Sequence, residues 1–336
     1  MATSLALCRP TIELGPGTVH SQSERGPGDD LLSDEPSETR IAAAEARGAV
    51  MKFGIMFANT GHGASAEGAK AVGRAAEEGG FEAIWTVEHV VVPSGYESKY
   101  PYDPSGKMAG GAEDFDLPDP LIWLTWVAAH TSTIKLATGI LILPQRNPVI
   151  TAKELATLDV LSGGRLMLGV GAGWLAEEFA ALNASFDDRG KRLDEYIDVM
   201  RALWSGDKTS FDGDFFQFEN CISKPRPEQG SIPIIIGGHS KVAARRAGRV
   251  GNGFFPGSAS ATEIADLVAI VRQTAEDNDR DPDSIQIIAS GGAPPGPKLD
   301  ERIEKLAGIG VTHAIMPTFP PDQLAEIGRS LNATYG

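Results

Sequence analysis

The sequence predicts an α/β fold in which eight parallel strands alternate with helices, as in a (β/α)₈ TIM barrel. The clearest unit covers 134–170. Two runs rich in Ile, Leu and Val, at 134–143 and 166–170, enclose a stretch whose apolar residues mostly recur at three- and four-residue spacings. That pattern predicts a strand, an amphipathic helix and a second strand. Neither run alternates apolar with polar residues, so both strands are expected in a parallel sheet covered on both faces.

The first half of the chain after residue 50 supplies four of these strands. Gly79-Gly80 can end the first helix, and Asp119 can cap the second. The expected strands are 52–57, 83–87, 134–143 and 166–170, and the expected helices are 66–78, 120–131, 148–161, 174–182 and 189–204. Residues 91–117 form a long irregular loop, and such loops in compact domains are usually disordered or functional, often as lids or binding loops.

The second half repeats the alternation after a small insertion. The pattern of residues 211–218 predicts a β-hairpin with a Gly-containing turn. The remaining strands are expected at 232–236, 253–256, 285–289 and 313–316, and the remaining helices at 241–249, 261–278, 299–307 and 321–331. A doubly wound open sheet is the alternative, because periodicity cannot show whether a sheet closes on itself.

Composition narrows the possible partners. At 336 residues and 42% hydrophobic, the chain can bury a substantial core. Its net charge of −15 argues against nucleic acids and membrane surfaces, since both are polyanionic. No apolar run approaches the ~18 residues that a membrane span requires. Cys8 and Cys221 are the only cysteines, which argues against a disulfide framework and suits a reducing cytoplasm.

The first fifty residues differ in character from the rest. They are poor in aromatic residues, rich in Gly, Pro, Ser and acidic residues, and show no sustained hydrophobic period. We therefore expect 1–50 to be a disordered extension and 51–336 to be the barrel domain. Met51 directly precedes the first strand, which suggests that it is the natural start.

Barrel enzymes place their chemistry at the C-terminal ends of the strands. His89 ends the second strand and can exchange a proton, although a hydrogen-bonded structural histidine is the alternative. Glu88 beside it points to the opposite face if the strand persists, so the two need not act as a pair. The candidates for a substrate pocket are Asn59, Tyr96, Tyr100, Tyr102 and Trp174.

Two glycine-rich turns follow predicted strands. Gly171-Ala-Gly-Trp-Leu-Ala176 matches the dinucleotide fingerprint G-x-G-x-x-A, but two helices follow where a Rossmann unit needs a strand closed by an acidic residue. These glycines are expected to let the backbone approach a flat ligand or a neighbouring turn. Gly237-Gly-His-Ser240 precedes a helix, where free N–H groups bind phosphate, and a plain tight turn is the alternative.

Other patterns point to no special chemistry. Arg189, Lys191 and Arg192 begin a predicted helix and are expected on a solvated face. The sequence holds no P-loop, no H-E-x-x-H and no zinc-type cysteine spacing, so we expect no metal centre.

Three stretches carry a resemblance to a known family. They are Thr138-Gly-Ile-Leu-Ile-Leu-Pro-Gln-Arg-Asn-Pro148, Leu155-Ala-Thr-Leu-Asp-Val-Leu-Ser-Gly-Gly-Arg165 and Leu168-Gly-Val-Gly-Ala-Gly-Trp174. Together with flanking matches over about 51–331, they resemble the luciferase-like monooxygenase superfamily, in its coenzyme F420-dependent (deazaflavin) branch. The resemblance implies a (β/α)₈ barrel with an insertion and a deazaflavin or FMN bound at the strand ends.

The resemblance also implies roles for individual residues. Position by position, it assigns cofactor contacts to Glu88, Gly139, Ile140, Ala172, Gly173, Gly237 and Gly238, with a non-proline cis peptide near Gly139–Ile140 and the phosphate at Gly237–Gly238. His89 takes the place of the proton donor. Trp174 stands where sugar-phosphate dehydrogenases of this branch carry a catalytic glutamate, so glucose-6-phosphate oxidation is not expected.

These implications give one leading hypothesis and two alternatives. The leading hypothesis is an F420-dependent oxidoreductase that transfers a hydride between the deazaflavin and a small organic substrate, with His89 moving the proton. The alternatives are an FMN-dependent monooxygenase of the same fold and a non-catalytic flavin-binding protein. The expected partners are a small-molecule substrate and a second copy of the chain, since dimers are usual among relatives, with no nucleic acid and no membrane.

Overall fold

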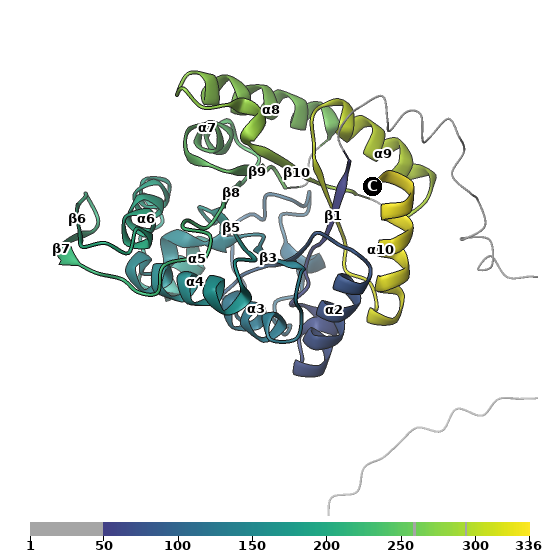
Figure 1. The fold of residues 1–336 in the computed structure, drawn as a ribbon, viewed down its shortest axis with the longest axis horizontal. Helices are drawn as coiled ribbons and strands as arrows, with labels where there is room; N and C mark the ends of the chain where they lie inside the picture. Colours follow the sequence, from purple (N-terminus) through teal and green to yellow (C-terminus); the bar gives the residue numbers. More distant parts are fainter. Residues whose placement is uncertain (1–49, 258–259, 293) are drawn as a thin grey trace, which may run out of the picture. The chain divides into compact units, whose positions relative to one another are not determined.

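Eight parallel strands close into a barrel in the computed structural model, which describes residues 50–257, 260–292 and 294–336 (Figure 1). Each strand pairs with the next, and the last pairs with the first. The strands of this ring, in order, are β1 (Lys52–Ile55), β2 (Ala83–Thr86), β3 (Lys135–Thr138), β5 (Leu166–Gly171), β8 (Ile234–Gly237), β9 (Gly253–Phe255), β10 (Gln286–Ser290) and β11 (His313–Met316). The predicted barrel is confirmed, and the closure excludes the doubly wound alternative.

A ring of helices packs around the strands (Figure 1). They are α2 (Ala66–Glu78), α3 (Pro120–Ala128), α4 (Pro148–Ser162), α5 (Ala176–Ala181), α6 (Arg189–Trp204), α7 (Lys241–Val250), α8 (Ala261–Glu276), α9 (Pro297–Gly308) and α10 (Pro321–Tyr335). Several begin at side-chain caps, in which Ser65, Asp119, Asn147 or Ser240 accepts a backbone N–H of the first turn. The main core lies between strands and helices, and a smaller cluster that includes Trp85 and Phe255 fills the barrel interior.

The third predicted strand is interrupted. Instead of a continuous strand over 134–143, β3 ends at Thr138 and β4 (Leu141–Ile142) resumes the pairing with β5. The break is a cis peptide bond between Gly139 and Ile140, at the position that the family resemblance implies. It forms a bulge at the C-terminal end of the barrel, where the site is expected.

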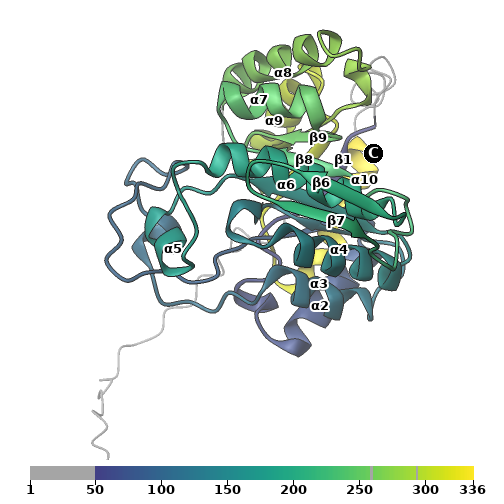
Figure 2. The same ribbon diagram turned by 90° about the vertical axis from the view of Figure 1, so that its left-hand side faces the viewer.

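Two insertions depart from the simple alternation. The hairpin of β6 (Thr209–Asp212) and β7 (Gln217–Cys221) lies beside α6 and is fixed there because the Glu195 carboxylate accepts the N–H groups of the hairpin turn (Figure 2). The second insertion is the loop after β2. It contains one short 3₁₀ turn, η2 (Met108–Gly111), and is otherwise irregular, as predicted.

The predicted disordered extension, 1–50, lies outside the described residues except for its last residue. Among the described residues, none of the helices has the length and apolar character needed to cross a membrane.

Candidate active site

A cavity of about 670 Å³ opens at the C-terminal ends of the strands. The ends of β2, β3, β5 and β8 supply the floor of the cavity. The loop between β2 and α3, residues 87–119, supplies much of its cover and is called the covering loop. Most of the predicted site residues line it, namely Glu88, His89, Tyr100, Tyr102, Gly139, Ile140, Ala172, Gly173, Trp174, Gly237 and Gly238. The strand-end rule for barrel enzymes therefore locates this cavity correctly.

His89 is held by a buried carboxylate. Its Nδ1 atom lies 2.9 Å from Oε2 of Glu178, a residue of α5, and the Glu178 side chain is fully buried. No hydrogen bond joins the other ring nitrogen, Nε2, to any part of the chain that the structure describes. A carboxylate at Nδ1 fixes both the orientation and the tautomer of the imidazole, so Nε2 is the atom available for proton exchange.

The two neighbouring carboxylates of α5 anchor the loop that covers the cavity. Glu178 Oε1 accepts the N–H of Val90 at 2.6 Å, and Glu177 Oε1 accepts those of Glu97 and Ser98 at 2.7 and 3.0 Å. The Ser98 hydroxyl and these N–H groups lower the pKa of Glu177 to about 2, because they stabilise its charged form. Figure 2 shows α5 beside this loop at one end of the barrel.

Aromatic side chains link the loop to the strand ends. Trp174 is the centre of this cluster: its ring centroid lies 5.2 Å from that of Tyr100, 5.5 Å from Tyr96 and 5.7 Å from His89. Tyr102 extends the cluster to the far side of the cavity, where its ring lies 5.1 Å from His239 after β8. These edge-to-face contacts form a cover that limits access of water to His89.

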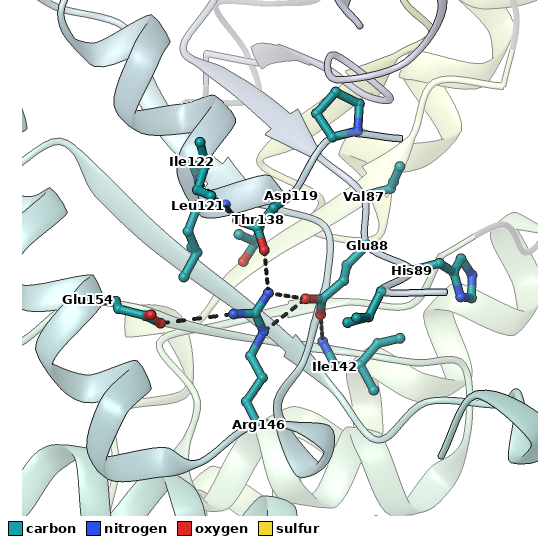
Figure 3. A network of polar contacts seen from close by, with 12 residues as sticks. Val87, Glu88, His89, Asp119, Leu121, Ile122, Thr138, Ile142, Arg146 and Glu154 are labelled. Atoms are coloured by element: carbon teal, nitrogen blue, oxygen red, sulfur yellow. Dashed lines mark hydrogen bonds and ion pairs between the residues drawn. The ribbon is translucent and has the colours of Figure 1, made fainter. Parts of the chain in front are cut away.

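Glu88 faces away from His89 and belongs to a different network (Figure 3). Its carboxylate accepts the N–H of Ile142 at 2.5 Å and pairs with the guanidinium of Arg146, which also bonds Asp119 at 2.9 Å. Burial raises the pKa of the Glu88 carboxyl, and the charge of Arg146 opposes that effect. Glu88 and His89 are therefore not a dyad, and Glu88 joins β2 to the bulge and to the start of α3.

The glycines at the strand ends make room for the bulge. A Cβ atom on Gly171 would lie 2.8 Å from Cδ1 of Ile140, and one on Gly237 would lie 2.5 Å from its Cγ2. Gly173 has a φ of +84°, and a Cβ there would collide with Phe179. The sequence left two interpretations of the Gly171–Gly173 turn, namely backbone approach to a flat ligand or to a neighbouring turn. The second accounts for Gly171, because the side chain of Ile140 in the bulge lies against it.

The end of the cavity near α7 is basic. Arg246 of α7 lines it and is held by two hydrogen bonds to Asp194, at 2.8 and 2.9 Å. Arg189 also lines it and donates to the carbonyl oxygens of Gly173 and Phe186. Gly238 and Ser240, at the N-terminus of α7, complete this end. The free N–H groups of a helix start, together with arginines, form a site that favours an anion.

Two predicted pocket residues lie behind the lining. Asn59 is fully buried; its side-chain amide donates to the carbonyls of Val87 and Pro118 at 2.9 and 3.0 Å and accepts the N–H of Val87 at 2.9 Å. Tyr96 is buried behind Trp174, and its hydroxyl accepts the N–H of Met108. Both residues position the cover of the cavity through these bonds, and neither reaches its interior.

Sequence reasoning missed three residues of this site. Glu178 was not singled out, because its pairing with His89 joins positions 89 residues apart in the chain. The expectation of a solvated face was wrong for Arg189, since the turn before α6 brings its side chain over the cavity. The buried Arg246 could have been suspected from its position on the apolar face of a helix that follows the Gly237–Gly238 turn.

The chain matches known proteins over nearly all of the described barrel. The model of the luciferase-like monooxygenase family matches residues 51–333. An uncharacterised protein of Mycobacterium tuberculosis (strain ATCC 25618 / H37Rv) is 31% identical over 244 residues, which is 72% of this chain and 82% of that protein. The F420-dependent glucose-6-phosphate dehydrogenase of Mycolicibacterium smegmatis is 37% identical over 175 residues, about half of each chain.

Solved structures share the fold. The monooxygenase RslO1 from Streptomyces bottropensis has a TM-score of 0.67 at 24% identity and covers 85% of this chain and 98% of its own. An F420-dependent secondary alcohol dehydrogenase has a TM-score of 0.69 at 16% identity, with 85% and 99% coverage. At such low identities these likenesses show the fold alone. The family match, the closed barrel and the cavity at its strand ends together show that this chain belongs to the luciferase-like monooxygenase family.

Proposed function

We propose that this luciferase-like oxidoreductase binds coenzyme F420 and transfers a hydride between the deazaflavin and a small organic substrate. The observation that carries the proposal is the pairing of His89 with the buried Glu178 on the wall of a cavity that Arg189, Arg246 and the start of α7 also line. The similarity to an F420-dependent dehydrogenase of Mycolicibacterium smegmatis supports the choice of coenzyme.

The residues of the cavity fit a flat cofactor that carries a phosphate. Ser240 and Ala243, at the start of α7, line the cavity, and Ser240 caps the helix by accepting the N–H of Ala243. The first N–H groups of a helix have no intrahelical partner. Arg189 uses Nε and Nη1 for backbone carbonyls, and its guanidinium lies 3.7 Å from the ring centroid of Phe186, while Nη2 has no hydrogen-bond partner in the described part of the chain. These groups would hold the phosphate, and the Gly139–Ile140 bulge with Ala172 and Gly173 would hold the ring system.

The deazaflavin, when bound, supplies a hydride carrier that does not readily activate oxygen. The protein contributes the proton. Glu178 holds Nδ1 of His89, so that Nε2 donates a proton to, or accepts one from, an oxygen atom of the substrate. Trp174 and Tyr100 cover His89 and limit the water around this transfer.

A titration of the purified protein with coenzyme F420 and, separately, with FMN tests the choice of cofactor. Ring fluorescence reports binding, and we expect F420 to bind at least about tenfold more tightly than FMN. Arg189→Ala should weaken F420 binding, since it removes a cation from the basic end. Tight FMN binding with no response to F420 would overturn the proposal in favour of the monooxygenase alternative.

The role of His89 is tested by His89→Ala. We expect F420 binding to stay within about twofold of wild type, while the rate of coenzyme reduction or oxidation by substrate falls by about 10²- to 10⁴-fold, the usual contribution of a positioned acid or base. His130→Ala, at the end of α3 and outside the cavity lining, is the matched control. Full activity of the His89 variant would end the proposed role.

A further inference from the structure

The covering loop reaches across the whole mouth of the barrel. It starts at the end of β2 and returns to α3, yet the ring of its Tyr102 lies against His239, after β8, and against Gly257, after β9. In the closed ring of eight strands, β9 is the fourth strand from β2 in either direction and therefore lies opposite it. The loop thus spans the cavity from one rim of the barrel to the other, and Tyr102 contacts the far rim.

The middle of the covering loop, residues 99–106, is held together by its own hydrogen bonds, and we call it the flap. The N–H of Tyr100 donates to the carbonyl of Gly106, and the N–H of Gly106 donates to the carbonyl of Asp103, both at 2.9 Å. The Asp103 carboxylate accepts the N–H and the hydroxyl of Ser105 at 2.8 and 2.5 Å. Among the described residues, no hydrogen bond or ion pair joins the flap to the far rim.

Polar bonds fix the covering loop on both sides of the flap. Just before it, the N–H of Ser98 donates to the carboxylate of Glu177 at 3.0 Å. Just after it, Nζ of Lys107 donates to the backbone oxygen of Tyr96 at 2.7 Å, and the N–H of Met108 donates to the Tyr96 hydroxyl at 2.9 Å. The base of the flap is therefore tied down at both ends, and hinges are expected directly beside these bonds.

Contacts of aromatic rings hold the flap over the cavity. The ring centroid of Tyr100 lies 5.2 Å from that of Trp174, and the centroid of Tyr102 lies 5.1 Å from that of His239. A Cβ atom on Gly257, whose φ is +74°, would lie 2.7 Å from Cε1 of Tyr102. The Tyr102 ring therefore rests directly on a backbone position that has no room for a side chain.

We propose that the flap opens and closes over the cavity as one unit, with Tyr102 as the latch that holds it shut against His239 and Gly257. Opening separates ring contacts and breaks none of the hydrogen bonds within the flap or at its base, so it needs no unfolding of the barrel. The closed flap covers the cavity with Tyr100, Pro101 and Tyr102, and the open flap admits a ligand.

Acrylamide quenching of Trp174 fluorescence reports the position of the flap without a ligand, because Trp174 contacts Tyr100 of the flap. The full chain carries Trp126→Phe, which removes an indole that is 43% exposed, and the three remaining tryptophans are at most 4% exposed. In this background, Tyr102→Ala should raise the quenching constant of Trp174, since loss of an aromatic contact shifts the opening equilibrium by about 2- to 10-fold. Tyr102→Phe should leave it unchanged, because the phenyl ring keeps the contacts with the far rim.

Gly257→Ala tests the latch from the far rim. Its methyl group would collide with the Tyr102 ring and should raise the quenching of Trp174 as Tyr102→Ala does. Gly230→Ala is the matched control: its φ of +76° gives the same backbone strain, but a Cβ atom there meets nothing within 4 Å, so quenching should not change. In the double variant Tyr102→Ala/Gly257→Ala, the second substitution should add nothing, because the ring that it displaces is gone.

Amide hydrogen exchange tests whether the flap moves as a unit. The N–H groups of Tyr100 and Gly106 should keep their wild-type protection in Tyr102→Ala, since the flap retains its own hydrogen bonds when it opens. Faster exchange at these amides would mean that the flap unfolds, contrary to the proposal. Equal quenching in the wild type and Tyr102→Ala, or a full effect of Gly257→Ala in the absence of the Tyr102 ring, would overturn the latch. Since no ligand takes part, neither result depends on the proposed cofactor.

Discussion

His89 and Glu178 form a buried pair across the wall of the cavity, with Nδ1 and Oε2 2.9 Å apart. Glu178 does more than orient the imidazole, because its second oxygen accepts the N–H groups of Val90 and Val91 at 2.6 and 3.4 Å. One carboxylate of α5 thus fixes both the candidate proton donor and the first residues of the covering loop. We regard Glu178 as a positioning residue that acts through His89.

Glu178→Gln tests this positioning role. The amide can still bond the loop N–H groups through its oxygen, but it loses the negative charge that holds the imidazole. We expect kcat to fall by about 10- to 100-fold, the usual cost of losing a partner of this kind, with KM and F420 affinity little changed. Glu177→Gln is the control, since Glu177 anchors the same loop without contacting His89. Equal losses in both variants would show that Glu178 merely holds the loop.

A second prediction concerns the bulge. Gly237→Ala would place a methyl group 2.5 Å from Cγ2 of Ile140 and 3.3 Å from the carbonyl oxygen of Val170. The bulge must then shift, which we expect to cost about 1–3 kcal/mol of unfolding free energy and to weaken F420 binding about tenfold or more. Denaturant unfolding and fluorescence titration measure the two effects.

Gly308→Ala is the matched control for that variant. A Cβ atom at Gly308, the last residue of α9, meets no atom of the described chain within 4 Å. It should leave both quantities unchanged or slightly raise stability, because Ala favours helix over Gly. Wild-type affinity in the Gly237 variant would remove the bulge from the proposed ring site.

The elements of the fold that carry local signals could be predicted from the sequence. Helix α2 begins after the capping Ser65 and ends before Gly79-Gly80, and it spans the predicted 66–78. Helix α6 and strand β11 also match their predicted ranges, 189–204 and 313–316. Caps, terminators and apolar periodicity act within a few residues, so one sequence records them.

The contacts that define the site depend on folding across the barrel. The pairing of Glu178 with His89 and the bond from Arg146 to Glu88 join residues on different elements, and no periodicity encodes them. The cis peptide at Gly139–Ile140 was implied by the family resemblance, since neither residue carries a local signal for it. The sequence thus located the cavity and part of its lining, while the rest of the lining and the partners of those residues required the structure.

A third prediction addresses the buried ion pair of Glu88 and Arg146. The Glu88 side chain is 1% exposed, and Arg146 is its cationic partner (Figure 3). Arg146→Ala leaves that carboxylate buried with only the N–H of Ile142, which we expect to lower the unfolding free energy by about 3–5 kcal/mol.

The double variant Glu88→Gln/Arg146→Ala should lose less than the Arg146 single variant, because it removes the uncompensated charge as well. Denaturant unfolding of the two singles and the double gives the coupling energy. Additive losses would mean that the two side chains contribute separately, contrary to the network in the structure.

The last prediction concerns His313, at the opposite end of the barrel from the cavity. Burial, and secondarily the charge of Lys52, lowers its pKa from 6.5 to about 4, while Glu82 opposes this effect. The folded state therefore disfavours the charged imidazole. Above pH 6.5 the side chain is neutral in both states, and its contribution to stability is fully present. As the pH falls from 6.5 to about 4, the unfolded chain gains a proton that the folded chain lacks, so stability is lost.

Wild-type protein and His313→Gln should therefore respond differently to acid. We expect the unfolding free energy of the wild type to fall, relative to the variant, by about 1.4 kcal/mol per pH unit across this interval, or about 3 kcal/mol in total. Comparing pH slopes removes the constant cost of the substitution and the titration of carboxylates common to both proteins. Urea unfolding at half-unit steps between pH 4 and pH 7 measures these slopes, and parallel curves would show that His313 titrates alike in the folded and unfolded chains.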